Sequence, residues 1–328
     1  MHHAEVSRSA FPEGPVAPPV VYQEPAVLRL RVVSAAALTI FAWASAFSAQ
    51  RRALRSYPPA ELALLRFLVA SALLASIRPI LRSRTPGIGD LPGILLAGLL
   101  GIFFYHLAIL NGQLSVTAGS ASFLSNTSPI FTAILAVLLL KERLGGAGWA
   151  GLGTGFLGAT LIALGEGHHW QLDPGALLIL AGALSWSFWF VIQKQFLTRY
   201  TALEFTTYTI WAGTLLLLPF LPRLVSHVRS YSPSATAAVV YLGVVPSAVG
   251  YVTWAYVLSQ IPVSRAAAFL YLIPPLAVLV AWGWLSEVPA PESLIGGAIS
   301  LAGIALVNRD RERASTAGAR SPRTAPGR

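Results

Sequence analysis

The sequence predicts an all-α membrane protein with ten transmembrane helices, arranged as a 5+5 inverted-topology repeat. Three observations predict this fold class. Of the 328 residues, 55% are apolar and only 11% are charged, with a mean hydropathy of +0.65, whereas a soluble domain carries about 25% charged residues. The apolar residues form ten long stretches. Rare residues also recur at a fixed offset between the two halves of the chain.

The composition excludes several classes of protein. The net charge of +10 does not indicate a nucleic-acid partner, because Lys and Arg occur in short loops and in the tails, as in membrane proteins. The chain has no Cys, which excludes disulfides, thiol catalysis and Cys-ligated metals. We expect no cofactor and no metal site.

Ten segments have the length and polarity of membrane helices, which need about 20 mostly apolar residues. They cover residues 33–53, 60–79, 92–111, 116–140, 148–165, 174–196, 204–221, 236–258, 263–286 and 291–307. Pro and Gly mark the breaks between them, as at Pro58-Pro59 and Gly145-Gly146. The segments group into a first unit, 29–165, and a second unit, 174–307. The Pro-rich tail 1–28 and the Arg-, Ser- and Pro-rich tail 308–328 are expected to be disordered.

The distribution of basic residues predicts the orientation. With both termini in the cytoplasm, 17 of the 23 Lys and Arg residues lie on the cytoplasmic side, five lie on the outer side and Arg66 lies within a span. This excess agrees with the rule that cytoplasmic loops of membrane proteins are rich in Lys and Arg. The first outer loop opposes this trend, since it carries three Arg residues. We therefore expect a multi-pass protein of a bacterial inner membrane with both termini cytoplasmic.

An internal repeat emerges when the chain is compared with itself. At an offset of 145 the matches are Gly98–Gly243, Pro129–Pro274, Glu142–Glu287, Gly151–Gly296 and Gly158–Gly303. At an offset of 143 they are Trp43–Trp186, Phe47–Phe190, Gln50–Gln193, Tyr57–Tyr200 and Glu61–Glu204. Five spans per unit is an odd number, so the second unit enters the membrane from the opposite side. Inverted repeats of this kind build alternating-access transporters with a substrate site between the halves.

Residues 33–307 resemble the EamA-type members of the drug/metabolite transporter superfamily. The resemblance is carried by Trp43-Ala44-Ser45-Ala46-Phe47, Leu65-Arg66-Phe67, Ser128-Pro129 and Lys141-Glu142-Arg143-Leu144. The second unit keeps Pro274 and Glu287 but has no basic residue beside the Glu. The resemblance implies the drug/metabolite transporter fold. Within that superfamily, the richness of this sequence in aromatic residues is most similar to that of the bacterial amino-acid exporters, including those for aromatic amino acids.

Polar and aromatic residues deep in the spans are the candidate binding residues, because polar groups in lipid are costly. Helical spacing places Trp43, Phe47 and Gln50 on one face, since they stand at i, i+4 and i+7. The predicted substrate-binding set comprises Trp43, Phe47, Tyr105, His106, Ser125, Asn126, Trp186, Phe190, Ser247, Tyr251 and Tyr271. Such a lining suits a zwitterion, with its ammonium over an aromatic face and its carboxylate on neutral polar donors. The competing interpretation places the aromatic residues in membrane-interface belts.

Three further features each allow a functional and a structural role, and a fourth has structural alternatives only. Pro129 and Pro274, near the middle of their spans, are either symmetric hinges or static kinks. Glu142 and Glu287 are either gates at opposite ends of the pathway or helix-end contacts. His106 is either a coupling group or a hydrogen-bonding partner of a neighbouring helix. Arg66, two turns into its span, is expected to reach the outer surface or to pair with Glu61, a structural role in both cases.

These features predict an alternating-access exporter of small zwitterionic or neutral metabolites, with amino acids, aromatic ones included, as cargo. No Asp or Glu lies in the middle of a span, which favours a facilitator over an ion-coupled carrier. The alternative is another cargo, such as a purine, a nucleoside or a cationic drug. A membrane-embedded enzyme or a receptor is the remote alternative, since the spans contain no catalytic dyad or ligand cluster. The expected partners are a small-molecule substrate and the lipid bilayer, with the protein a monomer or a homodimer.

Overall fold

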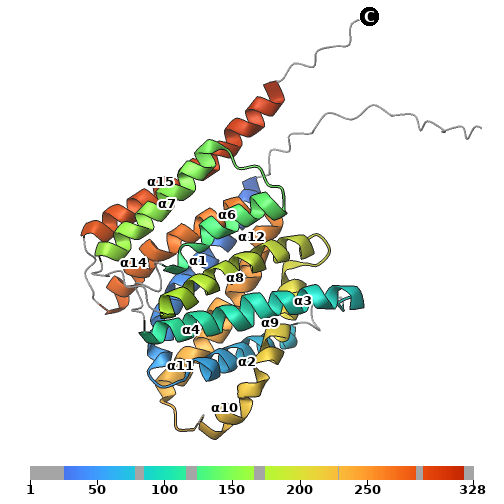
Figure 1. Cartoon of the computed structure of the whole chain (residues 1–328), viewed down its shortest axis with the longest axis vertical. Helices are drawn as coiled ribbons and strands as arrows, with labels where there is room; N and C mark the ends of the chain where they lie inside the picture. Colours follow the sequence, from blue (N-terminus) through green and yellow to red (C-terminus); the bar gives the residue numbers. More distant parts are fainter. Residues whose placement is uncertain are drawn as a thin grey trace, which may run out of the picture.

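A computed structural model describes residues 26–77, 85–115, 124–165, 174–227, 229–285 and 291–320. These residues form helices and connecting turns, without strands (Figure 1). In the first half the elements are α1 Ala26–Leu54, α2 Pro59–Ile77, η1 Ile88–Asp90, α3 Leu91–Gly98, η2 Leu99–Phe104, α4 Tyr105–Ser115, α6 Ser128–Leu139 and α7 Gly146–Gly165. In the second half they are α8 Pro174–Phe196, α9 Ala202–Leu217, η3 Leu218–Phe220, α10 Leu221–His227, α11 Pro233–Leu242, η4 Gly243–Val249, α12 Gly250–Gln260, α13 Val263–Ala268, η5 Phe269–Leu272, α14 Ile273–Leu285 and α15 Pro291–Arg320.

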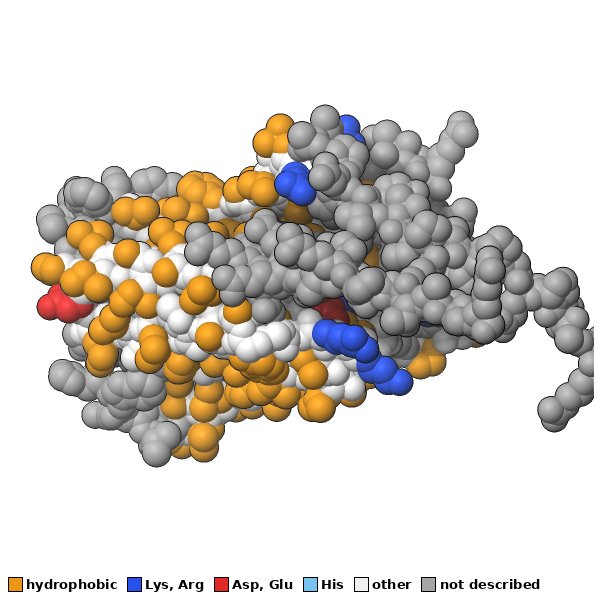
Figure 2. All heavy atoms as spheres, turned by 90° about the horizontal axis from the view of Figure 1, so that it is seen from above, with side chains coloured by type: hydrophobic (Ala, Val, Ile, Leu, Met, Phe, Trp, Pro, Cys, Tyr) orange, Lys and Arg blue, Asp and Glu red, His pale blue; other side chains and the backbone are white. Residues whose placement is uncertain are grey.

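Length and composition mark this as a multi-pass membrane protein. Six helical stretches in the described residues are long and apolar enough to cross a bilayer: Arg29–Leu54, Pro59–Ile77, Ile88–Ser115, Pro174–Phe196, Ala202–His227 and Pro233–Gln260. Shorter apolar helices cover Ser128–Leu139, Val263–Ala277 and Leu294–Val307. Large apolar side chains such as Leu138, Leu157 and Leu177 are exposed, and Figure 2 shows hydrophobic side chains over much of one face. A surface of this kind is solvated by lipid chains.

Two continuous spans contain a π-helical segment at corresponding places. η2 lies between α3 and α4, and η4 lies between α11 and α12. The residue that follows η2 is Tyr105, and the residue that follows η4 is Gly250, which is its match at the offset of 145. A π-turn places more residues in each turn than an α-helix, so it rotates the side chains that follow it.

Of the two prolines predicted near the middle of continuous helices, Pro129 instead begins a new helix, whereas Pro274 lies within an unbroken helical stretch, Val263–Leu285, where the helix type changes. Pro129 lies in the first turn of α6, after a turn at Asn126 and Thr127. Pro274 lies in the first turn of α14, directly after the 3₁₀ segment η5. At Pro129 the expected kink is thus a break in the helix, and proline is tolerated there because the missing N–H is not required in a first turn. At Pro274 the helix continues, and its pitch changes from 3₁₀ to α.

Glycine allows α7 and α15 to pack along their length, side by side in Figure 1. A Cβ atom on Gly151 would lie 2.7 Å from the carbonyl oxygen of Gly303, and one on Gly158 would lie 2.5 Å from that of Gly296. The backbones therefore approach more closely than any side chain permits. These glycines therefore serve close packing within the protein.

The C-terminal helix is longer than the apolar segment from which it was predicted. α15 continues to Arg320, whereas the apolar span ends at residue 307 and the tail beyond it was expected to be disordered. Hydropathy locates the end of an apolar stretch, but a helix can continue beyond it with polar residues. Most of the predicted N-terminal tail, residues 1–25, lies outside the described residues.

Candidate functional site

A cavity of about 80 Å³ lies in the core of the helix bundle. It is lined by Trp43, Ala46, Phe47, Gln50, Arg66, Tyr105, His106, Ile109, Ser125, Asn126, Ser128, Ala183, Trp186, Tyr251, Leu270 and Ile273. These residues come from both halves of the chain and include residues at the break before α6 and at the change from 3₁₀ to α-helix before α14. A single water needs about 10–15 Å³ of such space, so the cavity is large enough for several water molecules or for a small solute.

Aromatic rings form one wall of the cavity. The Trp186 ring lies 4.1 Å from that of Tyr105 and 5.5 Å from that of Trp43, measured between ring centroids. Tyr251 contacts both tryptophans, at 5.8 Å and 5.4 Å. The indole N–H of Trp43 donates a hydrogen bond of 3.1 Å to the carbonyl of Pro246 in η4. Because the indole polar atom is satisfied, the orientation of the ring is fixed.

His106 and Tyr251 contact each other at the centre of the bundle. The Nδ1 atom of His106 lies 2.9 Å from the carbonyl oxygen of Ile102, and its Nε2 atom lies 3.1 Å from the Tyr251 hydroxyl. A ring that donates from Nδ1 to the carbonyl accepts at Nε2 from the hydroxyl. Both nitrogens thus have partners, which favours the structural interpretation of His106 over a coupling role.

Arg66 lies in the cavity wall, which contradicts both placements predicted for it. The residue is 3% exposed, so it does not reach the surface. Its Nε atom donates a 2.6 Å hydrogen bond to the Ser247 hydroxyl. Glu61, the expected partner, instead accepts a hydrogen bond from the Tyr231 hydroxyl. The prediction was wrong because Ser247 comes from the second half of the chain, and the packing of η4 against α2 is not encoded in local spacing.

Eight of the eleven predicted binding residues line the cavity: Trp43, Phe47, Tyr105, His106, Ser125, Asn126, Trp186 and Tyr251. The other three lie behind or beside it. Phe190 packs against Trp186 at 5.3 Å, Ser247 holds Arg66, and Tyr271 packs in a separate cluster with Gly155.

Hydrogen bonds join the segment that follows α6 to α13 at one end of the bundle. The carboxylate of Glu142 accepts from the backbone N–H of Val263 at 2.7 Å, and from the N–H and hydroxyl of Ser264 at 3.0 Å and 2.6 Å. Nearby, the Lys194 ammonium donates to the carbonyl of Ile261 at 2.9 Å. The predicted gate residue Glu142 therefore makes contacts between the two halves. Glu287 lies outside the described residues.

The start of α2 carries a separate polar contact. The Glu61 carboxylate is 4% exposed, accepts from the Tyr231 hydroxyl and lies 3.9 Å from His227. Burial, together with the neighbouring carboxylate, raises the pKa of Tyr231 above its ordinary value. The phenol therefore keeps its proton and acts as the donor at neutral pH.

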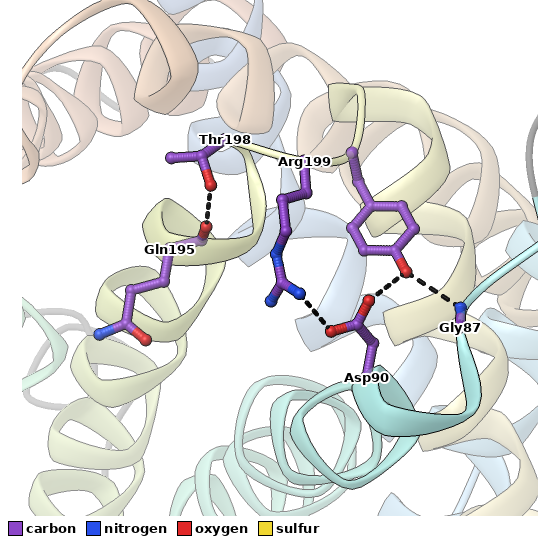
Figure 3. A network of polar contacts seen from close by, with 6 residues as sticks. Gly87, Asp90, Gln195, Thr198 and Arg199 are labelled. Carbon is purple, nitrogen blue, oxygen red and sulfur yellow. Dashed lines mark hydrogen bonds and ion pairs between the residues drawn. The ribbon is translucent and has the colours of Figure 1, made fainter.

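A third polar contact joins η1 to the turn after α8 (Figure 3). The Arg199 guanidinium donates to one Asp90 oxygen at 2.6 Å, and the Tyr200 hydroxyl donates to the other at 2.6 Å. The hydrogen bond to Asp90 raises the pKa of Tyr200. Arg199 is largely exposed, and an exposed ion pair contributes about 0–1 kcal/mol to the free energy of unfolding. The contribution of this contact to the stability of the protein is therefore small.

Across the described segments, no group of three or more His, Asp or Glu residues is arranged to hold a metal ion. The cavity presents aromatic faces, hydroxyl and amide groups, one imidazole and one guanidinium.

The sequence profile of the EamA-like transporter family matches the chain twice, at residues 30–164 and 173–309. The chain is 41% identical over 298 residues to a probable terminal-alkyne amino-acid exporter of Streptantibioticus cattleyicolor, covering 91% of this chain and 98% of that protein. It is 40% identical over 275 residues to the uncharacterized transporter YdfC of Bacillus subtilis, covering 84% and 90% of the two chains. A crystal structure superposes with a TM-score of 0.70 at 20% identity, covering 86% of this chain and 98% of the other, which supports the fold alone.

Proposed function

The chain belongs to the EamA-like transporter family and is a multi-pass membrane transporter, and from this premise we propose that it exports small zwitterionic or neutral metabolites by alternating access. Amino acids, aromatic ones included, are the proposed cargo. The observation that carries the proposal is the central cavity, which combines aromatic walls with polar groups and takes its lining from both halves of the chain.

Contacts between matched residues support a two-unit architecture of ten spans. His106 contacts Tyr251 across 145 positions, and Ser71 bonds Thr214 across 143 positions, at 2.9 Å. These separations equal the two offsets of the sequence repeat. In an inverted repeat, matched residues approach each other where they lie near the pseudo-two-fold axis. The double match of the family profile agrees with this arrangement. We place both termini in the cytoplasm.

The two prolines and the end contacts supply the moving parts of the proposed cycle. Pro129 and Pro274 stand where α6 and α14 begin beside the cavity, so small rotations there change its lining. Glu142 joins the halves at the cytoplasmic end of the proposed topology. Glu287, its match in the second unit, is proposed to act at the opposite end.

The cargo is inferred from the lining and from the relative. Trp43, Trp186 and Tyr105 offer aromatic faces to an ammonium or to an apolar side chain. The relative at 41% identity carries amino-acid export in its name. The spans have no carboxylate at mid-depth, which supports a facilitator driven by the substrate gradient.

Counterflow into proteoliposomes tests the proposal. Vesicles loaded with threonine, methionine or phenylalanine should take up the labelled amino acid in a protein-dependent manner. Ala46→Trp fills the cavity and should abolish uptake, whereas the matched Leu177→Trp on the exposed face of α8 should leave it intact. If a purine or a cationic drug were transported and no amino acid were, the alternative cargo would be correct and the proposed one wrong. If the two variants transported amino acids equally well, the cavity would not be part of the transport pathway.

A further inference from the structure

Arg66 is a buried charge with unsatisfied hydrogen-bonding capacity. Arginine keeps its proton in proteins, and a charged side chain in the interior of a membrane protein is costly unless it has partners. The side chain is 3% exposed, and its position in α2 lies within a span. A charge retained at that depth is by default a candidate functional group.

The contacts of Arg66 leave part of the guanidinium free. Nε donates to Ser247, and the Phe67 ring lies 5.4 Å from the central carbon of the guanidinium. Nη1 has no hydrogen-bond partner among the residues that the structure describes. None of the carboxylates in those residues lies within ion-pair distance of Arg66. The positive charge is therefore not neutralised by an acidic side chain of the described structure.

Arg66 belongs to the cavity wall. Arg66 lines the cavity together with Tyr105, His106 and Tyr251. Of these neighbours, His106 and Tyr251 form a hydrogen bond with each other. Among the four residues, the charged Arg66 is therefore the strongest hydrogen-bond donor available to a solute in the cavity. A guanidinium presents its N–H groups in a planar fork that matches the two oxygens of a carboxylate.

We infer that Arg66 binds the carboxylate of the transported molecule, so that the transporter selects solutes with a carboxylate group. The inference rests on the proposed function and narrows it. Ser247 is the positioning residue that holds Nε and directs the remaining N–H groups to the cavity. The aromatic wall of Trp43 and Trp186 takes the rest of the solute. A cationic drug, which lacks a carboxylate, would meet an uncompensated positive charge, and this opposes its binding.

Three probes separate the chemical groups of one solute: L-phenylalanine, 3-phenylpropionate, which lacks the amine, and 2-phenylethylamine, which lacks the carboxylate. Binding to the purified full-length protein in detergent is measured by calorimetry and by the fluorescence of the cavity tryptophans. Both carboxylate probes should bind, and the amine should bind at least about 30-fold more weakly, since an unpaired buried charge costs that much or more.

The variants test Arg66 itself. Arg66→Gln should weaken the binding of both carboxylate probes by about 30-fold or more, and Arg66→Lys should restore part of it because the charge remains. Arg199→Gln makes the same change at the exposed pair with Asp90 and should bind like the parent. Thermal unfolding identifies any variant that does not fold. If Arg66→Gln does not fold, the inference is tested by comparing the affinities of the three probes for the unmodified protein.

The inference would be overturned if 2-phenylethylamine and 3-phenylpropionate bound equally well, or if neither of the two carboxylate probes bound. Retention of full acid binding by a folded Arg66→Gln would do the same. Threonine or methionine counterflow alongside any of these results would leave the proposed amino-acid cargo in place without a carboxylate site. Arg66-dependent binding of 3-phenylpropionate without amino-acid flux would support the site and reject amino acids as the cargo.

Discussion

Replacing Glu142 with glutamine is expected to ease the opening of the end of the bundle where α6 meets α13. The carboxylate accepts three hydrogen bonds, two from backbone N–H groups and one from the Ser264 hydroxyl. Glutamine is nearly the same size but has one acceptor oxygen and no charge. The substitution therefore removes part of the contact between the halves without creating a cavity.

The size of the effect follows from the hydrogen bonds. A hydrogen bond to a charged group contributes about 1.5–3 kcal/mol and a neutral one about 0.5–1.5 kcal/mol. Glu142 is partly exposed, so solvent screening lowers the difference. A net loss of about 1.5 kcal/mol is expected, which shifts the balance between closed and open states by about tenfold.

Thiol accessibility measures this shift directly. The chain contains no Cys, so Ala46→Cys introduces a single thiol into the cavity wall. In inside-out vesicles, a membrane-impermeant maleimide should label this thiol about tenfold faster when Glu142→Gln is present. Glu292→Gln, at an exposed carboxylate in the first turn of α15, is the matched control and should not change the rate. An unchanged rate with Glu142→Gln would refute the assignment of this contact as a gate.

Three further outcomes are expected. His106→Gln should leave the pH dependence of transport unchanged between about pH 6 and 8, because both ring nitrogens serve hydrogen bonds; a lost pH dependence would identify a coupling group. Gly158→Leu should destabilise the protein by about 2 kcal/mol or more in thermal unfolding, because its Cβ would lie 2.5 Å from a carbonyl oxygen of α15, whereas Gly153→Leu, which meets no atom within 4 Å, should have little effect. Tyr231→Phe should lower stability by about 1–3 kcal/mol, since it leaves the buried Glu61 carboxylate without its phenol donor; an unchanged melting temperature would show that the contact contributes nothing.

Hydropathy and helical spacing were sufficient to predict the helical membrane architecture and eight of the sixteen residues that line the cavity. They succeed because lipid exposure selects apolar residues all along a span, so that a polar or aromatic residue deep within it marks the interior. Trp43 and Phe47 on α1, and Trp186 on α8, were located in this way and line the cavity or its aromatic wall.

The predicted residues that do not line the cavity include two that lie where the helices depart from regular geometry. Ser247, Tyr251 and Trp254 share a face on an ideal α-helix, but Ser247 lies within the π-helical η4, which changes the side-chain directions. Tyr251 consequently lines the cavity while Ser247 holds Arg66. Tyr271 lies in the 3₁₀ segment η5, whose three residues per turn direct it to Gly155 instead. Sequence periodicity does not report these local changes of pitch.

The distribution of polar groups between the centre and the ends fits the proposed cycle. At the centre, His106 and Tyr251 are almost fully buried and bond to each other across the two halves. Breaking such a bond without water leaves polar atoms unsatisfied, which is costly. At the end, the Glu142 contact is only partly buried, so water can replace its partners when it opens. In the proposed cycle, the contacts that open are therefore the partly buried hydrogen bonds at the helix ends. The sequence places Glu61, Glu142, Glu204 and Glu287 at those ends, and none in mid-span.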